Sequence, residues 1–320
     1  MKRFPIPALA LAALVAVYGA VPADADTIYT FTTLDDPAAT VGYYPNGAGT
    51  EAYAIYGNTV VGTGWGTNGV SGFSETGGVF TTLQDPTEFG YNITYATGIW
   101  GSTIVGFFFD PGIDVYSYTL TGGVYKTLAV PGAPQTYAEG IFDDTVVGNF
   151  NNGPGTIAQG FTETDGVYTT INDPNGAGGT DVQGIYGNTL VGIYIDGAGN
   201  YHGFSETGGV YTTIDDPNAT GGTEVMAIYG NTLVGNYVDG TGDHGFIETG
   251  GNYTSFDVPG TTITQIFGIS SDGTLVGTDE DGVGNHGFIA TPLSSSPEPA
   301  SLSLLVFGGV VLLVRRRKPA

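Results

Sequence analysis

The stretch 187–229, GNTLVGIYIDGAGNYHGFSETGGVYTTIDDPNATGGTEVMAIY, is followed directly by a second copy of the same pattern. That copy starts at Gly230 and reads GNTLVGNYVDGTGDHGFIETGGNYTSFDVPG. A tandem match of this kind means that one supersecondary unit is copied along the chain. The sequence therefore predicts a repeat architecture.

Two short features mark the repeat along the whole chain. An apolar pair followed by glycine occurs at Gly62, Gly106, Gly148, Gly192, Gly235 and Gly277. A proline after a strand-like run occurs at Pro37, Pro86, Pro131, Pro174, Pro217 and Pro259. The two series are out of phase, because the first marker along the chain is a proline, Pro37, and the last is a glycine, Gly277.

Each period contains the signals of four short strands. In one copy these are 224–229, 232–238, 244–249 and 252–258, separated by Gly-containing turns and ended by Pro259, which cannot continue a ladder. Four antiparallel strands in one such period are typical of the blade of a β-propeller.

The second strand of the period favours a propeller over a two-sheet sandwich. Leu190 and Tyr194 lie on one face of it, and Val191 and Ile193 lie on the other, so both faces are apolar. A blade packs between two neighbours, whereas a sandwich strand alternates apolar and polar residues. We expect the central glycine, here Gly192, to lie where blades crowd together.

The complete prediction is an all-β, six-bladed β-propeller of four-stranded blades spanning residues 26–292. The last copy lacks a fourth strand, and residues 27–37 match the fourth strand at 209–217. We therefore expect the N-terminal strand to complete the last blade and close the ring, which removes an open edge.

The N-terminus has the pattern of a signal peptide. Lys2 and Arg3 precede an apolar run at 8–18, and small residues at Ala23 and Ala25 predict cleavage after residue 25. The alternative is an N-terminal membrane anchor, although the run is short for one.

Residues 293–320 carry a second targeting pattern. Pro297, Glu298 and Pro299 precede a largely apolar stretch at 301–314, which is short for a stable membrane span. A basic end follows, which predicts transient insertion in the inner membrane with that end cytoplasmic; its residues are Arg315, Arg316, Arg317 and Lys318.

These three parts together resemble the PEP-CTERM sorting tail. The resemblance implies that an exosortase-type enzyme removes the tail, and that the protein reaches the cell surface or extracellular matrix of a Gram-negative bacterium. The alternative is an ordinary tail anchor. The repeats also resemble the HAF family of extracellular bacterial repeats, on residues 184–188, Val191–Gly192 and His202-Gly203-Phe204. That resemblance implies a propeller-like surface protein.

The charge balance excludes several functions. The net charge is −24, and Lys126 is the only basic residue between Phe4 and Val314. Nucleic-acid binding needs Lys or Arg to replace phosphate counterions, and phosphate or carboxylate ligands need a similar clamp. The chain has no cysteine, which rules out cysteine chemistry and disulfides.

Acidic loops are candidate calcium sites. Asp279 and Asp281 alternate with glycines as in loops that bind hard cations, and Asp196, Asp239 and Asp243 lie in shorter versions. The alternative is that Asp, Asn and Gly are ordinary turn residues. For the repeating histidines, His202, His244 and His286, we expect a role in packing or at a strand start rather than metal ligation.

The sequence predicts a non-catalytic, monomeric structural or binding module without a cofactor, calcium aside. Exopolysaccharide and other surface proteins are its candidate partners. The alternative is a carbohydrate-active enzyme, a glycosidase or lyase, which a non-repeating acidic pair facing a cleft would favour. Trp65, Trp100 and 107–109 are candidate sugar-stacking aromatics, with core packing as the alternative.

Overall fold

The computed structural model describes residues 28–39, 49–66, 69–84, 93–109, 114–153 and 155–293. The predicted signal peptide, the Pro297-Glu298-Pro299 motif and the basic end at 315–318 lie outside these residues, so their roles stay predictions. Within the described ranges all regular structure is β-strand. In this part of the chain no helix has the length and hydropathy needed to cross a bilayer.

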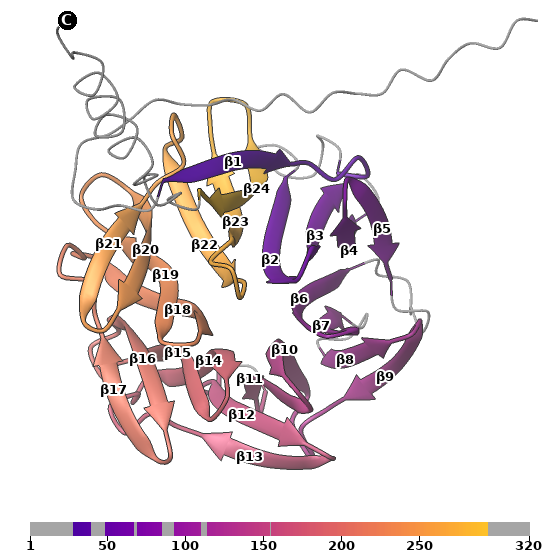
Figure 1. Cartoon of the computed structure of the whole chain (residues 1–320). Helices are drawn as coiled ribbons and strands as arrows, with labels where there is room; N and C mark the ends of the chain where they lie inside the picture. Colours follow the sequence, from indigo (N-terminus) through magenta and orange to yellow (C-terminus); the bar gives the residue numbers. More distant parts are fainter. Residues whose placement is uncertain are drawn as a thin grey trace, which may run out of the picture.

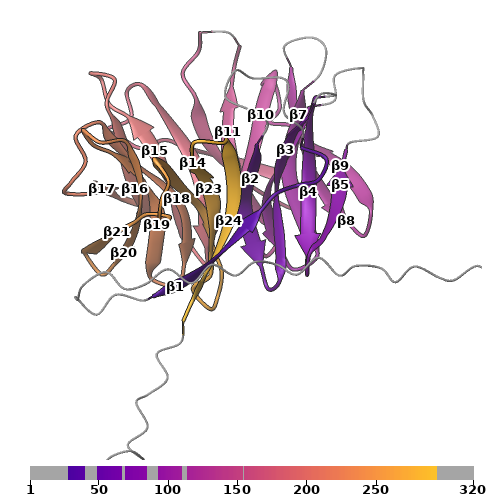
Figure 2. The same ribbon diagram turned by 90° about the horizontal axis from the view of Figure 1, so that it is seen from above.

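The strands form sheets that stand side by side around a central axis (Figure 1). Seen at right angles to that view, the strands run between two rims, with loops and turns at both (Figure 2). Three four-stranded sheets are each continuous in sequence: β2(Thr50–Tyr56), β3(Thr59–Gly66), β4(Gly69–Thr76) and β5(Val79–Leu83); β14(Gly179–Tyr186), β15(Thr189–Ile195), β16(Tyr201–Thr207) and β17(Val210–Ile214); β18(Gly222–Tyr229), β19(Thr232–Val238), β20(Asp243–Thr249) and β21(Asn252–Phe256).

The first strand, β1(Tyr29–Leu34), completes a fourth sheet of this kind. It pairs antiparallel with β24(Asn285–Pro292), next to β23(Leu275–Glu280) and β22(Ile263–Ile269) (Figure 1). The rings of Tyr29 and Phe31 pack on Phe256 of the preceding sheet, with centroids 5.2 and 5.7 Å apart. The N-terminal strand thus occupies the place that the sequence left open, and the chain closes on itself.

The remaining eight strands form one continuous sheet. It contains β6(Thr94–Trp100), β7(Thr103–Phe109), β8(Val115–Thr121), β9(Val124–Leu128), β10(Gln135–Phe142), β11(Thr145–Asn151), β12(Gln159–Thr164) and β13(Val167–Ile171). The fold is an all-β propeller with four separate four-stranded blades, so the prediction of six separate blades is wrong.

The two halves of this sheet join at a parallel bridge between β8 and β10. Gln135 lies opposite Val115, whose N–H donates to the Pro134 carbonyl oxygen at 3.0 Å. The ladder between β8 and β9 ends at Ser117, which leaves the Val115 edge free to pair. This pairing depends on how far one strand extends past its neighbour, and the repeat pattern does not encode that length.

The core lies between adjacent sheets, as the apolar second strand predicted. Val191 packs with Val225 and Ile228 of the following sheet. Leu190 and Tyr194, on the other face of β15, pack with the preceding sheet. Both faces of the strand are buried, which confirms this part of the prediction.

The atoms that crowd the recurring glycine belong to its own sheet rather than to a neighbouring one. Each inner strand has a bulge opposite this glycine, for example between Val182 and Gly184, which face Gly192 and Val191. A Cβ at Gly192 would overlap the carbonyl oxygen of Asp181 in the same sheet. The expected crowding is therefore present, but its cause is the bulge.

Replacing Gly192 with alanine should destabilise the protein by about 1–3 kcal/mol, the usual cost of overpacking. Backbone atoms cannot move aside as a flexible side chain can. Urea denaturation measures the change, and Gly197→Ala is a matched control, because a Cβ there meets its nearest neighbour at 3.8 Å. Equal stability of the two variants would refute the role given to Gly192.

Candidate functional site

A cavity of about 320 Å³ opens on the axis of the ring. Its volume falls within the usual range for small-molecule sites. Residues of all the innermost strands and of two following turns contribute to it, at the end where those strands turn into the next: 53–56 of β2 with residue 57, 97–100 of β6, 139–141 of β10, 183–186 of β14, 226–229 of β18, and 267–269 of β22 with residues 270 and 271. The site is thus a product of ring closure.

Small residues allow the inner strands to approach one another around this cavity. A Cβ at Gly140 would meet the Gln183 carbonyl oxygen at 2.9 Å, and one at Gly268 would meet the Tyr53 carbonyl oxygen at 2.8 Å. Alanine or glycine occupies the same position in every inner strand: Ala54, Gly98, Gly140, Gly184, Ala227 and Gly268.

The residue just before each small residue is the extra residue of the bulge. All of these bulge residues line the cavity: Tyr53, Thr97, Glu139, Gln183, Met226 and Phe267. The backbone position repeats, but its side chains differ in every repeat. The symmetric fold therefore presents an asymmetric set of groups to a ligand.

Aromatic side chains form an arc, here called the aromatic collar, at the turn end of the cavity. Neighbouring rings contact one another with centroids 4.3 to 5.0 Å apart. Its members are Tyr56, Trp100, Phe142, Tyr186 and Tyr229. The equivalent position in the last copy, directly after β22, is Ser270, so the arc has an opening there.

Polar contacts hold the collar rings in place. The Trp100 indole N–H donates to Asp143 Oδ1 at 3.0 Å. Asp143 sits in the turn after β10 with a φ of 49°. A hydrogen bond with Tyr229 raises the pKa of the Tyr186 hydroxyl. Trp100 and Tyr186 line the cavity directly, so their orientation is set before a ligand arrives.

The Glu139 carboxyl group lines the cavity, and the charge of the nearby Asp181 acts on it. Burial and the charge of Asp181 raise the pKa of Glu139 well above its usual range. Burial also raises the pKa of Asp181 to about 6, against the effect of a hydrogen bond from Asn149 Nδ2 at 2.7 Å. The axial region therefore concentrates negative charge in a poorly solvated place.

Two further acids, Glu51 and Glu224, lie on other inner strands, β2 and β18. The Tyr53 hydroxyl donates to Glu51 Oε2 at 2.5 Å. Burial raises the pKa of Tyr53, and Glu51 raises it further, so the phenol stays protonated. Burial, followed by the charge of Asp243, raises the pKa of Glu224. No basic residue lines the cavity to balance these groups.

The candidate calcium ligands lie away from this cavity and have protein partners. Asp196 Oδ1 accepts the backbone N–H groups of Ala198 and Asn200 at 2.7 and 2.9 Å. Asp281 Oδ1 accepts the N–H groups of Val283 and Gly284 at 2.6 and 3.2 Å. These are turn contacts, as the alternative interpretation expected.

The other three candidates are similarly placed. Asp239 Oδ1 accepts from the backbone N–H of Thr241 at 2.6 Å, and Asp243 Oδ2 accepts from Gln265 at 3.2 Å. Burial raises the pKa of Asp279 to about 6. Among the described residues no three His, Asp or Glu side chains lie close enough to hold a metal ion. Calcium binding stays a prediction without structural support.

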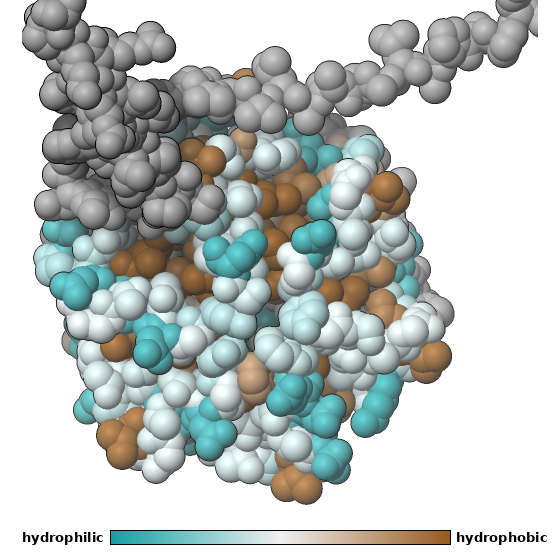
Figure 3. All heavy atoms as spheres, viewed as in Figure 1, coloured by the Kyte–Doolittle hydropathy of each residue, from teal (hydrophilic) through white to brown (hydrophobic). Residues whose placement is uncertain are grey.

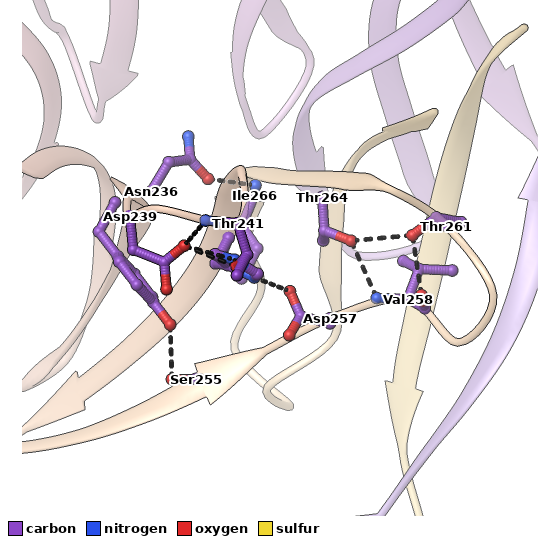
Figure 4. Close-up of polar contacts among 11 residues, drawn as sticks. Asn236, Asp239, Thr241, Ser255, Asp257, Val258, Thr261, Thr264 and Ile266 are labelled. Atoms are coloured by element: carbon purple, nitrogen blue, oxygen red, sulfur yellow. Dashed lines mark hydrogen bonds and ion pairs between the residues drawn. The ribbon is translucent and has the colours of Figure 1, made fainter. Parts of the chain in front are cut away.

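The histidines stand at the start of their strands, each between two aspartates. His244 lies 3.3 Å from Asp239 and 2.8 Å from Asp257. Figure 4 shows Asp239 with Thr241 on one side of this contact and Asp257 on the other. His202 likewise contacts Asp196 and Asp215. Each histidine therefore ties the loop before its strand to the end of the outer strand.

The third histidine makes the same contact across the ring closure. His286 Nδ1 lies 2.8 Å from Asp35 Oδ1, just after β1, and its Nε2 lies 3.7 Å from Asp281. The expected structural role of the histidines agrees with these contacts, and the ionic partners are an addition to it.

The candidate stacking aromatics separate into two groups. Trp100 belongs to the aromatic collar at the cavity. Phe107 and Phe108 are buried, and Phe107 stacks on Tyr95 with centroids 4.7 Å apart. Trp65 packs edge-on to Tyr95 at 6.2 Å. Of the three candidates, only Trp100 lines the cavity.

Sequence reasoning missed Glu139, Asp181 and most of the collar. Most acids recur with the repeat, and that recurrence marked them as part of the scaffold. The useful signal was variation rather than recurrence, because the position held by Glu139 carries a different residue type in every copy. Aromatic residues before the first turn in five of the six copies were a second signal.

Comparisons with known proteins support the fold. No family model matches the chain, and no curated protein matches it. The β-propeller domain of the Trilobed protease from Pyrococcus furiosus is similar at a TM-score of 0.50 and 10% identity, over 81% of this chain and 98% of that one. These values establish a similar fold and nothing about activity.

Two further solved structures are similar to the chain. Trypanosoma rangeli sialidase in complex with 2,3-difluorosialic acid is similar at a TM-score of 0.51 and 6% identity, over 82% of this chain and 59% of that one. The fucose-specific lectin from Aleuria aurantia is similar at 0.47 and 11% identity, over 81% and 99%. The last score is too low to support an argument.

The histidine contacts predict a pH dependence of stability. Burial lowers the pKa of His244 and of His286, but Asp257 and Asp35 outweigh it, so both pKa values are raised above the ordinary 6.5. A raised histidine pKa stabilises the fold fully below about pH 6.5, and this stabilisation is lost as pH rises through the folded value.

A variant with His244→Asn and His286→Asn should therefore lose more stability relative to wild type at pH 5.5 than at pH 8.5. The loss should stay within about 1 kcal/mol per contact, because these pairs are partly solvated. Subtracting the two unfolding curves removes the similar trend from Asp181, on which neither histidine acts. A difference that is independent of pH would contradict the ionic role.

Proposed function

We propose that this protein is a carbohydrate-binding module and that the axial cavity is its binding site. The observation that carries the proposal is the aromatic collar at the mouth of a cavity lined by polar groups. Sugar rings have apolar faces that pack on aromatic rings and hydroxyls that bond to polar side chains at the same time. The collar and the cavity wall offer both.

Size and surface character support this choice. Apolar and hydrophilic surface lie close together around the middle of the ring face in Figure 3. The wall beneath the collar offers the Gln183 amide and the Glu139 carboxyl group, together with the Tyr53 hydroxyl. A lipid or peptide site would need a longer apolar groove than a cavity of about 320 Å³.

The ligand is a neutral or cationic sugar rather than an acidic one. Sialic and uronic acids carry carboxylates, which proteins hold with Arg or Lys. Lys126 lies in β9, an outer strand, and its side chain is exposed. The inner strands contribute acids instead. The similarity in fold to a sialidase therefore does not extend to its ligand.

A second candidate function is hydrolysis of a glycosidic bond. Glycosidases use two carboxyl groups, one of them held protonated at neutral pH to act as an acid. Glu139 lines the cavity with a raised pKa, and Asp181 is its acidic neighbour. Release of shorter products by wild type, and its loss in Glu139→Gln, would establish this alternative over simple binding.

Export to the cell surface is part of the proposal. It is supported by the predicted signal peptide at 1–25 and by the sorting tail at 293–320 with its exosortase-type processing. A protein displayed in the extracellular matrix would meet polysaccharide there.

Binding should be visible through Trp100. The chain has two tryptophans, Trp65 and Trp100, and only the second lines the cavity. Oligosaccharides built on glucose, mannose, galactose or glucosamine are titrated while tryptophan emission is recorded, with an oligo-uronic acid as the negative control. We expect at least one non-acidic series to change the emission of wild type and of Trp65→Phe, but not of Trp100→Phe.

Truncation gives the matching energetic test. Trp100→Ala should weaken binding of that sugar about 10-fold or more, since loss of a central aromatic contact costs on the order of 1–2 kcal/mol. Tyr201→Ala removes an exposed aromatic away from the cavity and should leave the affinity unchanged. If no sugar affects Trp100, or if both alanine variants bind like wild type, the proposed site is wrong.

A further inference from the structure

Among the described residues, Glu139 is the one carboxyl group that lines the cavity, whereas Glu51 and Asp181 lie behind it on neighbouring positions of the inner strands. Glu51 accepts from Tyr53, and Asp181 accepts from Asn149. Among the described residues, nothing donates a hydrogen bond to the Glu139 carboxyl group; its surroundings act on it through burial and through Asp181. The Glu139 side chain is half-buried, and a carboxyl group partly removed from water is costly unless a partner satisfies it.

The geometry places this group where a ligand can supply the partner. Glu139 is the bulge residue of β10, so its side chain leaves the ladder and lines the cavity. Inner strands on either side of β10 add Thr97 and Gln183 to the same wall, neither of which is cationic. A positively charged ligand group would meet a carboxylate with no competing cation.

The aromatic collar favours the same sign of charge. The faces of Trp and Tyr rings are negative and attract cations within about 6 Å. The cavity is also lined by Trp100, Tyr186 and Tyr229. Each lies nearer the turn end of its strand than the position equivalent to Glu139. A cation that passes these rings on its way to Glu139 is therefore attracted first by the ring faces and then by the carboxylate.

We propose that the cavity binds the protonated amine of an amino sugar, with the Glu139 carboxylate as its counter-ion and the collar packed on the sugar ring. This inference rests on the proposed function and names the ligand class: a polysaccharide whose hexosamine units carry free rather than acetylated amines. An ammonium group beside Glu139 favours the ionised carboxylate. The amine's N–H groups then form charge-assisted hydrogen bonds to it.

The ligand pair that isolates the charge is a β-1,4-linked glucosamine tetramer and its fully N-acetylated form. Both have the same backbone, and only the first carries ammonium groups. Calorimetry at pH 7 should show binding of the free-amine tetramer about 10-fold or more tighter, the range expected for a hydrogen bond to a charged group. Raising the salt concentration should reduce this preference.

Glu139→Gln should abolish the preference, so that the free-amine and acetylated tetramers bind with equal affinity. Glutamine fits this bulge position, because Gln183 occupies the equivalent place in β14. Asp165→Asn is the matched control, since it removes one exposed negative charge at a turn with a φ of 53°, which asparagine tolerates. That control should keep the wild-type ratio, and unfolding curves verify that both variants are folded.

The outcomes separate this inference from the proposed function. Equal binding of both tetramers, with loss of both in Trp100→Ala, would overturn the amine preference and leave the sugar site intact. An unchanged ratio in Glu139→Gln would also overturn it. Failure of both tetramers to bind, or binding of a lysine-rich peptide instead, would contradict this amino-sugar site.

Discussion

The bulge in each inner strand depends on the glycine that faces it in the next strand. At Gly192 the Asp181 carbonyl oxygen occupies the space that any Cβ would need. The bulge inserts one residue that does not pair, and that residue is the one that lines the axis. A constraint on the backbone therefore creates the cavity, while the extra side chain is free to differ from repeat to repeat.

The molecule has few cationic residues, so the behaviour of each acidic residue depends on which protein groups contact it. In the described chain the acids at the loop rim are matched by backbone N–H groups and by histidines such as His244. The acids on the axis have fewer partners, and burial raises the pKa of Glu139 and Asp181. The rim acids therefore stabilise turns, whereas Glu139 on the axis remains available to a ligand.

Much of the fold was predictable, because strand periodicity and turn chemistry repeat. The strand predicted at 232–238 is β19, and the N-terminal strand pairs with the last copy as expected. Separate blades were wrongly expected throughout, since the Val115–Gln135 bridge depends on strand overhang. Of the site, only Trp100 was among the predicted residues. The rest was not predicted, because residues such as Glu139 and Met226 share a backbone position without sharing chemistry.

The most direct measurement is a crystal structure of the protein soaked with the glucosamine tetramer. The account predicts a sugar ring packed against Trp100, with an amine nitrogen about 2.7–3.2 Å from a Glu139 carboxylate oxygen. A tetramer ordered between the outer strands, with none of it in the axial cavity, would contradict the account.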